Sequence, residues 1–157
     1  MQNLIISEEP IETSGALSVF HAAVDELNRR YGDGSDDRQR VIEELTRPRG
    51  FFLVARESHH LAGGVGVRTI AELEDHLGEV KRLWIRPDLR RVGVASALMS
   101  AVLDRARELG YRRLYLETGP AQPEALAFYP HTGWTPVEEF PPGVFSHPGA
   151  SRFFRDL

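Results

Sequence analysis

The first part of the chain carries apolar side chains at the spacing of two helices. Between Thr13 and Arg30 apolar residues recur every three or four positions, and this stripe predicts an amphipathic helix. The polar segment 32–37 contains two glycines and predicts a loop. A second stripe at Val41, Ile42 and Leu45 predicts a shorter helix. The order of elements is therefore expected to begin with two helices.

From Gly50 onward the pattern is that of strands. Residues 51–55 form a continuous apolar run, and residues 61–70 form a second run that is rich in glycine and valine. The polar residues 58–60 separate them, so a hairpin is predicted. Residues 72–76 predict the next turn, and residues 78–85 a third strand. This strand is expected to end before Pro87, because proline cannot donate a hydrogen bond to a strand ladder.

The rest of the chain alternates helices with short strands. Apolar residues on one face predict a long helix that opens near Gly93 and ends at Gly110, a residue suited to a left-handed cap. A strand over 112–117, a helix over 123–128, a strand opening at 133–135 and a last strand over 151–155 follow. This order predicts an α/β (α+β) fold in which helices pack on a mixed sheet.

Composition and charge narrow the class of protein. The 157 residues suit one domain over 1–157, with 41% hydrophobic and 27% charged residues. No apolar run is long enough for a membrane span, and the start lacks the features of a signal peptide. The chain has no cysteine, so it has no disulfide and no thiolate metal site, and a cytoplasmic location is expected. The net charge of −4 argues against broad nucleic-acid binding. The histidines form no ligand pair, so no metal is expected.

The segment from strand 80–85 to the helix start predicts an anion site. A helix start leaves backbone N–H groups unpaired and carries partial positive charge. Gly93 and Ala95 are small enough to let a phosphate approach, and Arg90 and Arg91 add charge. From these residues alone, a phosphate site and an ordinary solvated loop are equally open. The fingerprints of nucleotide-hydrolysing and dinucleotide-binding loops are absent.

Two motifs resemble those of the GNAT family of N-acetyltransferases. The first is Glu79-Val-Lys-Arg-Leu-Trp-Ile-Arg-Pro87 followed by Arg90-x-x-Gly93-x-Ala95. The second comprises Leu116-Glu-Thr-Gly119, Gln122-Pro-Glu-Ala125 and Phe128-Tyr129-x-x-x-Gly133-Trp134. The expected element order is similar to that of the family along nearly the whole chain. The resemblance implies the GNAT fold, with a central, twisted, mixed but mostly antiparallel sheet flanked by helices.

The resemblance further implies that acetyl-CoA is the co-substrate. Its pyrophosphate would lie on the loop amides, and its pantetheine arm would add to strand 78–85, where that strand splays from strand 112–117 at a bulge. The cofactor-binding positions implied are Leu83, Trp84 and Ile85, then Arg90, Arg91, Val92, Gly93, Val94, Ala95 and Ser96, and finally Gln122. Gln122 stands where many members carry an asparagine.

The resemblance of the same motifs to the family implies two catalytic residues. Tyr129 matches the tyrosine that in many members protonates the departing thiolate, although Pro130 is expected to end its helix early. Glu79 matches a glutamate that serves some members as the base that deprotonates the amine. Glu79 paired with Lys81 on the same strand face is the alternative, and Glu117 is a second candidate base.

The acceptor is left open by the sequence. A small-molecule primary amine is expected, bound by segments 31–37 and 140–147. Asp33, Asp36, Asp37, Glu138 and Glu139 could favour a cationic amine or be ordinary solvated acids. The alternative function is that of an acyl-CoA-binding regulator with little turnover. Dimerisation is common in the family, and the sequence does not decide between a monomer and a homodimer.

Overall fold

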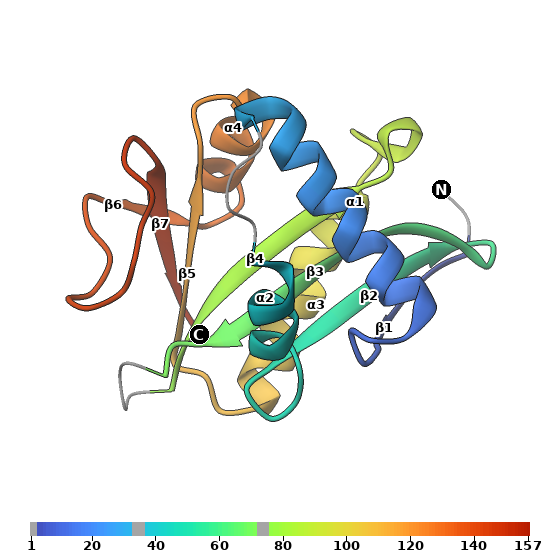
Figure 1. Cartoon of the computed structure of the whole chain (residues 1–157), viewed down its shortest axis with the longest axis horizontal. Coiled ribbons are helices and arrows are strands. Elements are labelled where there is room, and N and C mark those ends of the chain that lie inside the picture. Colours follow the sequence, from blue (N-terminus) through green and yellow to red (C-terminus); the bar gives the residue numbers. More distant parts are fainter. Residues whose placement is uncertain (1–2, 33–36, 72–75) are drawn as a thin grey trace.

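The computed structural model describes residues 3–32, 37–71 and 76–157. Its elements are β1 (Leu4–Glu8), α1 (Ser14–Tyr31), α2 (Arg38–Glu44), β2 (Gly50–Glu57), β3 (His60–Thr69), β4 (Leu77–Ile85), a 3₁₀ turn η1 (Pro87–Leu89), α3 (Val94–Glu108), β5 (Arg113–Thr118), α4 (Pro123–His131), β6 (Thr135–Val137) and β7 (Ser151–Asp156). Figure 1 shows α1 and α2 in front of a twisted sheet and α3 behind it.

The seven strands form one sheet in the order β1-β2-β3-β4-β5-β7-β6. Every neighbouring pair is antiparallel except β4 and β5, which are parallel. The prediction of a mixed, mostly antiparallel sheet flanked by helices is therefore confirmed. In the described part of the chain, no helix has both the length and the apolar character that a membrane span requires.

The core lies on both faces of this sheet. On one face, the stripe of α1, with Phe20 and Val24, packs against Phe52 and Val54 of β2. On the other face, Leu53 of the same strand packs against α3. Successive side chains of a strand point to opposite faces, so a strand covered on both sides is apolar throughout. This explains the continuous apolar run over 51–55.

Strand β1 corrects the expected order of elements. Residues Leu4–Glu8 pair antiparallel with β2, so a strand precedes the two helices. The strand is five residues long and alternates half-buried with exposed side chains at the edge of the sheet. Strand β6 also begins later than predicted, at Thr135. Gly133 is instead in a turn with φ +89°, and the Trp134 N–H donates to the last turn of α4 at Tyr129 O.

Candidate active site

Strands β4 and β5 diverge in the middle of the sheet. They pair only from Leu77 to Glu79 and from Arg113 to Tyr115, although β4 continues to Ile85 and β5 to Thr118. The register between β3 and β4 also shifts near this point, and Arg82 takes a left-handed φ of +61°. The expected splay at a bulge is therefore present, and Figure 1 shows the two strands separating. Beyond Glu79, the β5-facing edge of β4 is open to an extended ligand.

The loop before α3 leaves a run of backbone amides unpaired. Arg91 and Gly93 have positive φ values of 66° and 98°, and Gly93 is the N-cap of a 15-residue helix. Within the described residues, the N–H groups from Arg91 to Ser96 donate to no protein acceptor. Converging amides at the positive end of a helix form an anion site. No Cβ is present at Gly93 to obstruct the approach.

The two arginines of this loop, Arg90 and Arg91, differ in the contacts of their guanidinium groups. Arg90 Nε donates to Ile85 O at 2.8 Å, and Arg90 Nη2 lies 2.6 Å from Glu26 Oε1 of α1. Its guanidinium therefore holds the loop to β4 and α1. The Arg91 side chain is exposed and has no ion-pair partner in the described ranges. Of the two guanidinium groups, that of Arg91 is the one available to a bound anion.

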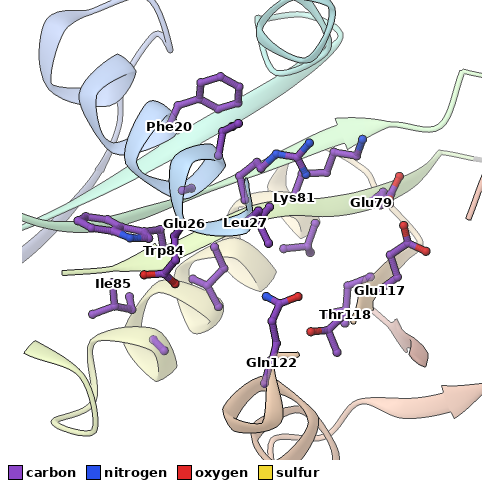
Figure 2. A pocket seen from close by; sticks show the side chains of 18 of the residues that line it. Phe20, Glu26, Leu27, Glu79, Lys81, Trp84, Ile85, Glu117, Thr118 and Gln122 are labelled. Carbon is purple, nitrogen blue, oxygen red and sulfur yellow. The ribbon is translucent and has the colours of Figure 1, made fainter. Parts of the chain in front are cut away.

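A cavity of about 1020 Å³ joins this loop to the diverging strands. Most of the predicted site residues line it. Figure 2 shows side chains of the lining projecting from α1, β4, β5 and the start of α4. The predicted residues on its wall are Glu79, Leu83, Trp84, Ile85, Arg90, Arg91, Gly93, Ala95, Ser96, Gln122 and Tyr129. The side chain of Val92 is exposed, and that of Val94 is buried in the core. Neither side chain lines the cavity, and the main-chain N–H groups of both residues belong to the unpaired run.

Tyr129 presents a buried phenol to the cavity. The residue is 6% exposed, and its ring packs against Phe128, Trp134 and Phe153. Its hydroxyl has no hydrogen-bond partner among the described residues. Burial raises the pKa of this hydroxyl, so it stays protonated at neutral pH and can donate a proton.

Helix α4 continues through Pro130 to His131, so the expected early end is wrong. Proline removes one bond, from its own position to the Leu126 carbonyl, and this lies in the last turn of a nine-residue helix. Thr132 closes the end, because its Oγ1 donates to Phe128 O at 3.0 Å and its N–H donates to Tyr129 O. The proline therefore leaves Tyr129 within a regular turn.

Glu79 is buried and paired with a cation from the neighbouring strand. Arg68 lies directly across from it in the β3–β4 register, and Arg68 Nε donates to Glu79 Oε1 at 2.8 Å. The two residues are 7% and 4% exposed. Lys81 instead has its Nζ 4.0 Å from Glu44 Oε1, and burial lowers its pKa. The cation bonded to Glu79 is thus Arg68, and not Lys81 as in the alternative that the sequence left open.

Gln122 ties the end of α1 to the loop between β5 and α4. Its Oε1 accepts from Tyr31 Oη at 3.1 Å and from the Gly119 N–H at 3.2 Å. The Ala121 N–H donates to Tyr31 Oη at 3.2 Å. Since the side-chain oxygen of Gln122 is already occupied, its amide N–H₂ is the group left for a ligand.

The structure adds two cavity residues that the sequence did not single out, His147 and Thr118, and it adds a side-chain atom, Nε1, of the already predicted Trp84. His147 lies on the wall beside Glu117, with its Nδ1 2.6 Å from Glu117 Oε1. These residues are 30 positions apart in the sequence. Thr118 Oγ1 and Trp84 Nε1 are buried and have no hydrogen-bond partner in the described part of the chain. Buried polar atoms are normally paired, so these two are candidates for contacts with a ligand.

The charges at the end of the cavity beside α2 are of both signs. Asp37 and Glu44 line the cavity, but so do basic residues from α2, β3 and β4, namely Arg38, Arg40, Arg68, Lys81 and Arg82. Glu138 and Glu139 do not line it, and Asp33 and Asp36 fall outside the described residues. Within those residues, no three His, Cys, Asp or Glu side chains are grouped to hold a metal ion.

Comparisons with known proteins agree with this geometry. The profile of the Acetyltransferase (GNAT) family matches residues 17–134. An IAA acetyltransferase of Azospirillum brasilense is 33% identical over 123 residues, which are 76% of this chain and 78% of that protein. The uncharacterized N-acetyltransferase YjgM of Escherichia coli K12 is 29% identical over 98 residues, 62% of this chain and 59% of that protein.

The fold is shared with solved structures. A GNAT family acetyltransferase from Elizabethkingia anophelis, crystallised with acetyl-CoA bound, superposes with a TM-score of 0.72. The alignment covers 100% of both chains at 14% sequence identity. The matched profile spans both motifs, from α1 through the anion loop to Trp134. The chain therefore belongs to the GNAT family of acetyltransferases, whose co-substrate is acetyl-CoA.

Proposed function

We propose that the protein transfers the acetyl group of acetyl-CoA to a primary amine of a small molecule, by direct attack of the amine nitrogen on the thioester. The observation that carries this proposal is the meeting of three features in one cavity. These are the unpaired amides before α3, the open edge of β4 and the buried hydroxyl of Tyr129. Together they match a ligand with an anionic end, an extended arm and a leaving group.

The chain's own groups fit such a co-substrate. The amides from Arg91 to Ser96 would hold the pyrophosphate, with the Arg91 side chain as a counter-ion. The main chain at Leu83–Ile85 would pair with the pantetheine arm. Thr118 Oγ1, which is buried and has no hydrogen-bond partner among the described residues, would gain one. When bound, acetyl-CoA supplies the activated carbonyl carbon.

Tyr129 is proposed as the general acid. It would donate its hydroxyl proton to the thiolate as the carbon–sulfur bond breaks. A main-chain N–H of β4 would stabilise the negative charge on the carbonyl oxygen. The role of Glu79 as the base that deprotonates the amine stays a prediction. Its carboxylate faces the cavity, but Arg68 already donates to Oε1, which leaves less of the carboxylate to accept a proton from an amine.

The acceptor is proposed to be a small molecule because the wall of the cavity is built from several elements. Helices α1 and α2, the strands β4 and β5 and the segment before β7 all contribute, and the ties between Tyr31 and Gln122 join two of its sides. Such walls suit a compact acceptor.

The test is an amine panel that measures thiol release from acetyl-CoA, with product identity checked by mass spectrometry. The expected result is amine-dependent release of one thiol for each acetylated product. Tight binding of acetyl-CoA without turnover on any amine would contradict the proposal and favour a cofactor-binding regulator.

A further inference from the structure

Glu117 holds a histidine from a distant loop on the wall of the cavity. It stands on β5 two residues past Tyr115, the last residue paired with β4, and therefore on the same face of the sheet as Glu79. Its Oε1 lies 2.6 Å from His147 Nδ1, and its Oε2 accepts from the His147 N–H at 3.1 Å. Figure 2 shows the Glu117 carboxylate projecting from β5 into the cavity.

Further contacts fix this carboxylate from the other side. Ser146 Oγ donates to Glu117 Oε2 at 2.5 Å, and Arg152 Nε donates to Ser146 Oγ at 2.6 Å. Both oxygens of Glu117 are thus occupied, and its side chain is 14% exposed. A carboxylate held in this way is poorly placed to take a proton from a substrate, but well placed to orient an imidazole.

The contact to Glu117 decides which nitrogen of His147 is free. An ionised carboxylate only accepts hydrogen bonds, so the neutral imidazole must carry its proton on Nδ1. Nε2 then has a lone pair. The His147 side chain is 72% exposed, so a proton taken up at Nε2 can pass on to water. Glu79 is 4% exposed and bonded to Arg68, so a proton that it accepted would have a poorer route to water.

We propose that His147, oriented by Glu117, is the catalytic base that takes the proton from the ammonium group of the acceptor. This rests on the proposed acetyl transfer. His147 Nε2 accepts one proton from the ammonium and leaves a neutral amine, whose lone pair forms the carbon–nitrogen bond as the carbon–sulfur bond breaks. Tyr129 gives its proton to the thiolate, and the second proton lost by the nitrogen restores Tyr129. The proton on His147 leaves to water, so one proton is released for each turnover.

Among the described residues, two charged side chains contact His147. Glu117 from β5 faces its ring, and Arg152 from β7 reaches its main-chain oxygen at 3.5 Å. The Phe145 ring packs on it with centroids 4.9 Å apart. In this assignment Glu117 is a positioning residue, because it acts through the imidazole.

The test compares His147→Asn with His59→Asn on two acceptors of the same shape. His59 is an exposed histidine in a turn with φ 72°, a conformation that asparagine adopts readily, and it does not line the cavity. The acceptors are the best primary amine of the panel and its weakly basic β,β-difluoro analogue. Both are assayed at a pH above the pKa of the analogue's ammonium group, so that the analogue is largely neutral and the parent amine is protonated. His147→Asn is expected to lower kcat/KM about 100-fold for the basic amine and less than about 10-fold for the analogue. His59→Asn should change neither.

Equal losses of kcat/KM on both amines, or no loss, would overturn the role of His147 while leaving the acetyl transfer intact. If the wild-type protein acetylated no amine, both proposals would fail. A second readout does not depend on turnover. In ¹⁵N spectra of the free protein, neutral His147 should carry its proton on Nδ1, and Glu117→Gln should disturb this preference. A proton on Nε2 in the wild-type protein would also overturn the assignment.

Discussion

Replacing Tyr129 by phenylalanine is expected to slow acetyl transfer without weakening the fold. The change keeps a ring that packs against Phe128, Trp134 and Phe153 and removes a hydroxyl without a described partner. Burying an unpaired hydroxyl costs folding about 1–3 kcal/mol. Because Tyr129 lines the cavity, water can offset part of this cost. The free energy of unfolding should therefore rise by at most about 1 kcal/mol, and the melting temperature by about 2–4 °C.

The effect on the reaction has the opposite sign. A positioned general acid contributes about 10²–10⁴-fold to the rate, so kcat for thiol release should fall at least about 100-fold. The hydroxyl meets its partner only as the thiolate forms, and the affinity for acetyl-CoA should therefore change little. Loss of rate together with unchanged or higher stability separates a functional hydroxyl from a structural one.

The assay pairs thiol release under saturating substrates with thermal unfolding followed by circular dichroism. Tyr115→Phe is the matched control, because Tyr115 is also 6% exposed but does not line the cavity. That variant should keep the wild-type kcat. Full turnover by Tyr129→Phe would refute the general-acid role. A loss of more than about 1 kcal/mol of stability would show that the hydroxyl has a partner in the folded protein.

Three further changes test the anion loop, an ion pair and the core. Gly93→Val should weaken acetyl-CoA binding in calorimetry at least about tenfold, because its side chain would obstruct the approach of the anion. It should also destabilise the protein by about 1–2 kcal/mol, because valine is strained at a φ of +98°. The hydrogen bond from Arg47 holds the pKa of Glu8 below its usual value. This bond therefore stabilises the folded protein above the unfolded pKa of about 4.3, and the stabilisation is lost as the pH falls through the folded pKa. In urea unfolding the wild type should be more stable than Glu8→Gln at pH 7, and the two proteins should become equally stable in acid. Phe20→Ala, at a fully buried side chain, should lower the free energy of unfolding by about 3–5 kcal/mol in the same assay.

The elements that the sequence predicted carry a local signal of their own. The α1 stripe extends over enough residues to establish a helical period, and the apolar runs of β2 and β3 are separated by a polar turn. Strand β1 escaped prediction because only five residues alternate, and its partner β2 lies more than forty positions away. The helical path through Pro130 was also missed, since Thr132 and the Trp134 N–H satisfy the end of α4 from outside the helix.

In the candidate site, too, the features formed by neighbouring residues could be predicted from the sequence, and the contacts between distant residues could not. The anion loop is contiguous, so its glycine, its small residues and the helix that follows could be identified from spacing alone. The partner of Glu79 depends on the register between β3 and β4, which places Arg68 directly opposite it. The pair of Glu117 and His147 depends on how the segment before β7 folds back over β5. Neither contact could be predicted from the spacing of the residues in the sequence.

The backbone at Arg82 and Arg91 links the fold to the proposed function. Both are non-glycine residues in the left-handed region, with φ of +61° and +66°, and each costs folding about 1–2 kcal/mol. Arg82 lies at the bulge where β4 leaves the regular register, and Arg91 begins the run of unpaired amides before α3. Both strained positions therefore lie where backbone groups are kept open to the cavity. A fold optimised for stability alone would replace each with glycine or close the ladder between β4 and β5. The position of these two residues supports the proposed site for an extended anionic ligand.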